Sequence, residues 1–176
     1  MQDMDECKAR LRTIKAVALD VDGTLTDGGL WWGVNGEEMK RFSFADIMGV
    51  SLLRRAGFRI ALISGEDSPL VTRYAAKLLI EDVARGCRNK ATALQGFAEQ
   101  RSLQLSEICF MGDDVNDLPA MAIAGLSATP ADAHAEVLAA AGFVCSKPGG
   151  HGAVRELADA LLHARGLKGT DVFRTK

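Results

Sequence analysis

The sequence predicts an α/β fold, a three-layer sandwich in which helices cover both faces of a mostly parallel sheet. Apolar runs of strand length alternate with segments of helical spacing, a pattern that requires crossover connections between parallel strands. The strands are continuously apolar rather than alternating, which indicates that both faces of the sheet are covered. The order is broken once, by a segment after the first strand that has the signals of a β-hairpin.

The predicted elements follow the chain in a regular order. The expected strands are the apolar runs at residues 16–20, 59–64, 80–84, 107–112, 124–128 and 142–146. The expected helices have apolar residues at helical spacing and lie at residues 45–56, 68–79, 90–101 and 133–141, after a leading helix in the first dozen residues. We expect one domain over residues 1–176, with its core at about 14–163 and a loose polar tail at 166–176.

The predicted hairpin, which we call the flap, occupies about residues 28–44. An apolar pair, Trp31 and Trp32, precedes a turn at Asn35 and Gly36, and a second run follows it. Because the flap comes directly after the first strand, it should project beside the carboxyl end of that strand. The two tryptophans then either pack the flap onto the core or contact another subunit.

Composition limits the class of protein. The chain of 176 residues is 48% hydrophobic and 25% charged, as in an ordinary globular protein. A formal net charge of −2 offers no basic surface, so neither nucleic acid nor a membrane is an expected partner. The amino-terminal residues lack the apolar core of a signal peptide, and the four cysteines are too scattered for a metal pair. We therefore expect a cytoplasmic protein with free thiols.

The stretch KAVALDVDGTLTD, residues 15–27, carries the strongest chemical signal. Its apolar run ends on Asp20 and Asp22, one residue apart, before a turn at Gly23. Paired carboxylates at a strand end can hold a divalent cation, since Mg²⁺ prefers oxygen ligands. A polar turn after a buried strand would look similar, because Asp and Gly are common in turns.

Further polar residues stand where the other predicted strands end. Because ligands bind at the carboxyl ends of parallel strands, these residues should meet in one site. Asp20 would be the nucleophile that forms an aspartyl phosphate, and Asp22 the general acid and base. Ser64 would donate to the phosphoryl oxygens, Lys90 would supply positive charge, and Asp20, Asp22 and Asp113 would bind Mg²⁺.

Each of these residues has a simpler explanation when taken singly. Ser64 can be a helix cap, and Lys90 can be a solvated helix residue. Asp113, Asp114 and Asp117 can be a solvated capping loop, although Asp114 or Asp117 can also support the metal through water or orient Lys90. Taken together, these simpler explanations are much weaker than each one alone, because four independent strand ends would have to imitate the parts of one active site in the right order.

The residues resemble the four motifs of the haloacid dehalogenase superfamily. DVDGT resembles the first motif, the serine of LISG the second, Lys90 the third and GDDVND the fourth, over residues 15 to about 162. The resemblance implies a Rossmann-like core and Mg²⁺-dependent phosphatase activity. Substrate choice in the superfamily depends on inserted cap domains, and the spacing of the motifs here leaves room for the flap but for no cap domain.

Within the superfamily the chain resembles the uncapped phosphatases of 3-deoxy-D-manno-octulosonate 8-phosphate, in lipopolysaccharide biosynthesis. The resemblance lies in DVDGTLTDG, GEEMKRF, GDDVNDLPAM, PADAHAEV and PGGHGAVREL. It implies a small sugar acid phosphate as substrate. It also implies a homotetramer in which the flaps form a central barrel and a neighbouring subunit covers each site.

The stretch ISGE leaves the sugar open. Octulosonate-type enzymes usually have Arg where this chain has Glu66, whereas phosphatases of nine-carbon acids, the N-acylneuraminate and deoxynononate types, resemble ISGE. Gly65 and Glu66 are therefore expected at the substrate, where Glu66 would accept bonds from hydroxyls and repel a carboxylate. Arg73 or Lys77 of an adjacent subunit, or Arg155, would then bind the substrate carboxylate.

Three other functions fit less well. A signalling receiver domain needs its phosphorylated Asp at the end of the third strand, and the region IEDVARGC ends without such an Asp. A nucleotide-binding Rossmann domain needs a glycine fingerprint after the first strand, where DVDGTL is acidic. A non-catalytic assembly domain of a sugar-nucleotide pathway would not need Asp20, Asp22, Ser64, Lys90 and Asp113 together.

Overall fold

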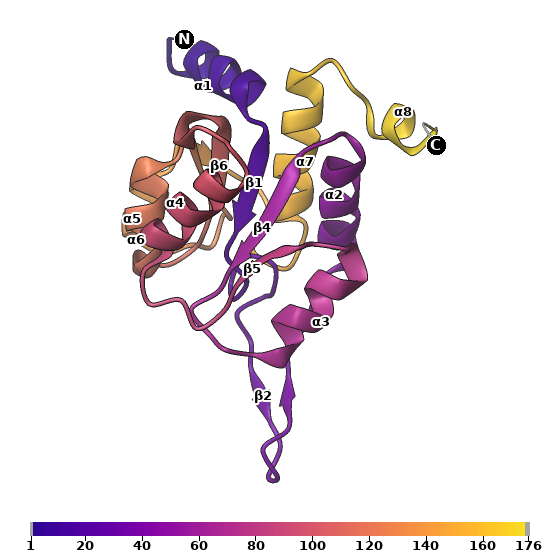
Figure 1. Ribbon diagram of the computed structural model, residues 1–176, viewed down its shortest axis with the longest axis vertical. Helices are drawn as coiled ribbons and strands as arrows, with labels where there is room; N and C mark the ends of the chain where they lie inside the picture. The colour runs from indigo at the N-terminus through magenta and orange to yellow at the C-terminus, as the bar shows by residue number, and fades with distance from the viewer. Residues whose placement is uncertain (1, 175–176) are drawn as a thin grey trace.

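The structure, a computed structural model, describes residues 2–174. Its main sheet has six strands in the order β5-β4-β1-β6-β7-β8, all parallel (Figure 1). The strands are β1 (Ala16–Leu19), β4 (Arg59–Ile63), β5 (Asp82–Ala84), β6 (Ile108–Met111), β7 (Leu126–Thr129) and β8 (Phe143–Val144). The predicted parallel sheet is confirmed, and each predicted strand is present.

Helices cover both faces of the sheet, which confirms the three layers (Figure 1). One face carries α1 (Gln2–Thr13), α2 (Phe44–Arg55), α3 (Pro69–Leu78), α7 (Ala153–Ala164) and α8 (Gly169–Arg174). The other face carries α4 (Lys90–Gln100), α5 (Leu118–Ile123) and α6 (Ala135–Ala140). Along β1, Val17 and Leu19 enter the first core and Ala16 and Ala18 the second, as the alternation of a strand requires.

Local sequence explains where the helices begin. Ser43, Ser68 and Asn89 precede α2, α3 and α4, and each side chain accepts a hydrogen bond from a first-turn backbone N–H. Pro69 then occupies the first turn of α3, where its missing N–H costs nothing. Ser68, rather than Ser64, is thus the helix cap of this region.

The flap is the small antiparallel sheet of β2 (Trp31–Trp32) and β3 (Glu38–Met39), which projects from the body of the molecule (Figure 1). An antiparallel bridge between Thr26 and Phe42 closes its base. Trp31 is 67% and Trp32 76% exposed, so the tryptophans do not pack onto the core of this protomer. There is no cap domain between β1 and β4.

The end of the chain differs from the prediction of a loose polar tail at 166–176. Residues 169–174 form α8, while Thr175 and Lys176 lie outside the described residues. Val172 is buried against the core, and the guanidinium of Arg55 stacks over the Phe173 ring at 4.6 Å. Val172 and Phe173 are adjacent and show no helical spacing, so the sequence signal was too weak for this helix, which tertiary contacts stabilise.

Cys87, Cys109 and Cys145 carry free thiols, as predicted, and Cys109 is fully buried in β6. In the part of the chain that the structure describes, no helix is both long and apolar enough to cross a lipid bilayer.

Candidate active site

The chemistry-bearing residues gather at the carboxyl end of the central strands. The last residue of β1, Leu19, is in register with Leu62 of β4 and Met111 of β6. Asp20, Ser64 and Gly112 therefore leave the sheet at nearly the same level, and the backbone N–H of Asp20 still donates to Met111 O at 2.9 Å. Parallel register alone thus brings the first, second and fourth sequence motifs together.

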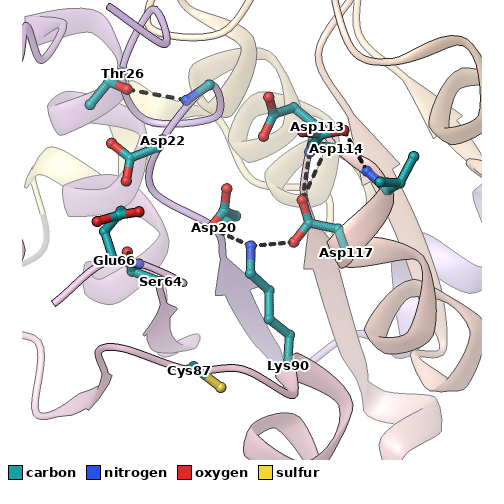
Figure 2. A network of polar contacts seen from close by, with 12 residues as sticks. Asp20, Asp22, Thr26, Ser64, Glu66, Cys87, Lys90, Asp113, Asp114 and Asp117 are labelled. Carbon is teal, nitrogen blue, oxygen red and sulfur yellow. Dashed lines mark hydrogen bonds and ion pairs between the residues drawn. The ribbon is translucent and has the colours of Figure 1, made fainter. Parts of the chain in front are cut away.

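Lys90 joins the site from the first turn of α4. Its Nζ lies 2.7 Å from Asp20 Oδ1 and 2.6 Å from Asp117 Oδ1, and Figure 2 shows it between the two carboxylates. The lysine is 3% exposed, so it is not a solvated helix residue. Burial by itself would lower the pKa of Lys90, but the ion pairs with Asp20 and Asp117 outweigh it and raise that pKa.

Asp117 holds this arrangement together. Its second oxygen, Oδ2, accepts from the backbone N–H groups of Asp113 and Asp114 at 3.0 and 3.2 Å. Asp117 is fully buried and thereby links Lys90 to the loop after β6. Asp114 is exposed and caps the short turn η2 (Val115–Asp117). Of these two aspartates, Asp117 is the one whose carboxylate contacts and orients Lys90.

Asp20, Asp113 and Asp117 form an acidic cluster, with one oxygen of each within 4.8 Å of the others. Burial raises the pKa of Asp20 to about 6. The charge of Lys90 lowers this pKa and the charge of Asp117 raises it, but burial has the largest effect. Burial and the neighbouring Asp20 and Asp117 raise the pKa of Asp113 to about 8. One ammonium thus faces several carboxylates, and the buried Oδ1 of Asp113 has no protein partner. A divalent cation fits this donor set, because it supplies the missing positive charge.

Glycines allow the acidic residues to approach. Gly23 has a φ of +80°, and a Cβ built on it would overlap the carboxylate of Asp113. A Cβ on Gly112 would likewise overlap Asp117. Gly23 therefore lets the turn after β1 approach the loop after β6, and Gly112 lets that loop fold back onto its own Asp117.

Asp22 lies outside the acidic cluster. Its Oδ1 forms an ion pair of 2.8 Å with Lys40 Nζ, a residue of the flap. Figure 2 shows Asp22 on the same side of the site as Ser64 and Glu66, apart from Asp113 and Asp117. The expected metal role of the Asp22 carboxylate is therefore still a prediction, while its place beside the nucleophile suits an acid and base.

Ser64 and its neighbours occupy the turn after β4. Ser64 is fully buried, and its Oγ accepts from the backbone N–H of Glu66 at 3.2 Å. Gly65 and Glu66 are exposed at the mouth of the site. The turn thus presents a buried hydroxyl beneath an exposed carboxylate, as Figure 2 shows.

The three basic residues expected at the substrate do not contact these groups within the described protomer. Arg73 and Lys77 line a cavity of about 420 Å³ between α3, α2 and the base of the flap, together with Phe42. The Nε of Arg155 donates to both carboxylate oxygens of Asp159, at 3.0 and 2.9 Å, one turn along α7. The structure therefore does not bring Arg155 to the aspartates of the candidate active site.

The loop of residues 149–152 packs against the turn after β1. The backbone N–H of Gly150 donates to Thr24 O at 3.1 Å. Asp46, buried in the first turn of α2, accepts from the backbone N–H groups of Gly152 and Arg155, both at 3.0 Å. The amino end of α7 is thus fixed beside the site.

Sequence reasoning missed Lys40, Glu38 and Ser68. Ser68 Oγ donates to Glu38 Oε1 at 2.6 Å, and this hydrogen bond holds the pKa of Glu38 below its ordinary range. Lys40 Nζ lies 3.7 Å from the same carboxylate oxygen. The available signal was strand alternation, because Glu38 and Lys40 are two residues apart and share one side of the flap.

Comparisons with known proteins agree with this geometry. The family model of haloacid dehalogenase-like hydrolases matches residues 74–157. The 3-deoxy-D-manno-octulosonate 8-phosphate phosphatase of Haemophilus influenzae is 41% identical over 166 residues, which are 94% of this chain and 91% of that protein. The chain belongs to this family of haloacid dehalogenase-like hydrolases.

Solved structures of this hydrolase family have the same fold. One is the octulosonate 8-phosphate phosphatase of Moraxella catarrhalis in complex with magnesium ion, phosphate ion and KDO, at 34% identity and a TM-score of 0.91, covering 97% of each chain. Another is the cobalt-bound Haemophilus influenzae phosphatase, at 41% identity and a TM-score of 0.87, covering 89% of this chain and 92% of that one.

Proposed function

We propose that this hydrolase is a Mg²⁺-dependent phosphatase of 3-deoxy-D-manno-octulosonate 8-phosphate, a phosphorylated 2-keto-3-deoxy sugar acid. The observation that carries the proposal is the position of Asp20, next to Lys90 at the end of the central strand. The similarity to octulosonate 8-phosphate phosphatases over nearly the whole chain supports it.

Asp20 and Asp113 would hold the metal, and Asp22, which lies outside the acidic cluster, is the third proposed ligand. When bound, Mg²⁺ would neutralise these carboxylates and withdraw charge from the phosphoryl group. Lys90 keeps Asp20 ionised and oriented, while Asp117 keeps Lys90 in place.

The reaction takes two displacements at phosphorus, with Asp20 as the nucleophile in the first and the leaving group in the second. A carboxylate oxygen of Asp20 attacks phosphorus, the bond from phosphorus to the sugar oxygen breaks, and that oxygen takes a proton from Asp22. Water then attacks phosphorus, gives its proton to the Asp22 carboxylate, and the bond to Asp20 breaks to release phosphate. Ser64 would donate a hydrogen bond from its hydroxyl to a phosphoryl oxygen during both steps.

Glu66 supports a second candidate, the phosphate of a nine-carbon acid, either N-acylneuraminate or deoxynononate 9-phosphate. Its exposed carboxylate stands at the mouth of the site, where it can accept bonds from sugar hydroxyls. The names of the relatives favour the eight-carbon substrate, and the side chain favours the nine-carbon one.

A homotetramer in the cytoplasm is the proposed working form. The exposed Trp31 and Trp32 support an interface at the flap, and the free thiols support a reducing compartment. An adjacent subunit would then bring Arg73 or Lys77 to the substrate carboxylate. This arrangement would also cover a site that has no cap domain.

The test is phosphate release in the presence of Mg²⁺ from octulosonate 8-phosphate, deoxynononate 9-phosphate, N-acetylneuraminate 9-phosphate and glucose 6-phosphate. We expect the highest kcat/KM for the first. A preference for a nine-carbon acid would favour the second candidate, and Glu66→Arg should then shift the preference toward eight carbons. Hydrolysis of none of them would favour an assembly domain without catalysis.

A further inference from the structure

The strongest feature that the proposed reaction leaves unexplained is the ion pair between Lys40 and Asp22. Lys40 Nζ lies 2.8 Å from Asp22 Oδ1, and the lysine side chain is only 3% exposed. A buried ammonium loses its hydration, and a buried charge without a partner costs several kcal/mol. Lys40 is therefore placed against Asp22 by the fold rather than by chance on the surface.

The surroundings of Lys40 explain its burial. Lys40, together with Phe42 and Tyr74, lines the cavity of about 420 Å³. These two rings stack with their centroids 4.6 Å apart and form an apolar wall. Along this wall the lysine stem can pack, while its charged end reaches the carboxylate.

A chain of contacts connects the same lysine to the start of α3. Ser68, the cap of α3, donates to Glu38 at 2.6 Å, and Glu38 lies 3.7 Å from Lys40 Nζ. Lys40 in turn reaches Asp22. Glu38 in β3 and Lys40 directly after that strand thus link the start of α3 to the turn after β1.

We propose that Lys40 is a positioning residue that fixes the carboxyl group of Asp22 for proton transfer. The proposal rests on the acid and base role of Asp22 in the proposed function. The ion pair engages Oδ1, which leaves Oδ2 to exchange the proton with the sugar oxygen and then with water. In this role Lys40 acts on the reaction only through Asp22, while Glu38, held by Ser68, keeps its ammonium in place.

A double-mutant cycle tests whether Lys40 acts through Asp22. We expect Lys40→Met to lower kcat for the sugar acid phosphate by about 10-fold to 100-fold with little change in KM, a part of what general acid–base catalysis contributes. Lys40→Arg should restore most of this loss. In the Asp22→Asn background, Lys40→Met should cause no further loss, since the group that it positions is gone.

A burst experiment with p-nitrophenyl phosphate gives an independent readout. Its leaving group needs little protonation, so Lys40→Met should form the aspartyl phosphate at a near-normal rate and hydrolyse it slowly. We expect a burst of about one nitrophenolate per site, followed by a slow steady state. The matched control is Lys15→Met. This substitution removes a lysine that precedes β1 and pairs with Glu107, and it should leave the turnover of both substrates unchanged.

The outcomes separate this inference from the proposed function. If the wild type hydrolyses its substrate and the two substitutions are additive, Lys40 has a general structural role and the inference is wrong. An active wild type whose kcat is unchanged by Lys40→Met also overturns it. A wild type that hydrolyses neither substrate contradicts the proposed function itself.

Discussion

Gly149 packs its Cα directly against the carbonyl group of Gly23, so that a Cβ built on Gly149 would overlap that oxygen. This contact joins the loop before α7 to the turn that carries Asp22. The end of the chain therefore supports the start of the active site, although the two segments are more than a hundred residues apart in the sequence.

Gly149→Ala should consequently damage both stability and activity. The added methyl group must push the turn of residues 23–27 away, at a cost of about 1–3 kcal/mol, as for other overpacked sites. Thermal unfolding and kcat would show the two effects together. As a matched control, Gly96→Ala in α4 adds a methyl group where nothing lies within 4 Å, and it should stabilise the protein slightly. Unchanged kcat in Gly149→Ala would mean that the loop does not support the site.

Asp20→Asn should abolish turnover and leave the fold intact. The amide has nearly the shape of the carboxylate but cannot form an acyl phosphate, so we expect a loss of about a thousandfold or more. Phosphate release measures the loss, and circular dichroism checks the fold. Turnover close to that of the wild type would refute Asp20 as nucleophile.

The stabilisation by Mg²⁺ should increase with pH. Because burial raises the pKa of Asp113 to about 8 and that of Asp20 to about 6, the folded protein without metal binds protons that the unfolded chain releases. Its stability should therefore fall as pH rises from the ordinary value of 3.8 toward 8. Mg²⁺ replaces those protons, so it should raise the unfolding temperature by at least about 2 °C more at pH 8.5 than at pH 6.

Asp113→Asn distinguishes the effect of Mg²⁺ binding on stability from the effect of the charge on Asp113. The substitution removes a buried negative charge, so at pH 8.5 the metal-free variant should be more stable than the metal-free wild type. It should also lose most of the stabilisation by Mg²⁺. An equal response of variant and wild type to Mg²⁺ would place the metal elsewhere.

Replacing both exposed tryptophans should change assembly without unfolding the protomer. Trp31→Ser with Trp32→Ser removes apolar side chains that make little contact within the protomer, so its unfolding temperature as a monomer should change little. We expect light scattering to show a tetramer for the wild type and smaller species for the variant, with a higher KM for the sugar acid phosphate. A monomeric wild type would contradict the proposed tetramer.

The sequence by itself determined the sheet, the flap and the five helices expected in the first dozen residues and at 45–56, 68–79, 90–101 and 133–141. Apolar runs, capping serines and glycine turns are local signals, and each depends on residues close together in the chain. The same holds for Asp20, Ser64 and Lys90, because their places at strand ends or at the start of a helix follow from the order of the elements. Parallel register then had to bring them to one edge.

Only the tertiary structure decided which partner each charged residue takes. Lys40 pairs with Asp22 because the bridge between Thr26 and Phe42 places the returning end of the flap beside the turn after β1. Lys90 likewise pairs with Asp20 and Asp117, which lie far from it along the chain. The helix at residues 169–174 also depends on contacts with α2. These pairings depend on distances across the fold, which the spacing of residues along the chain does not fix.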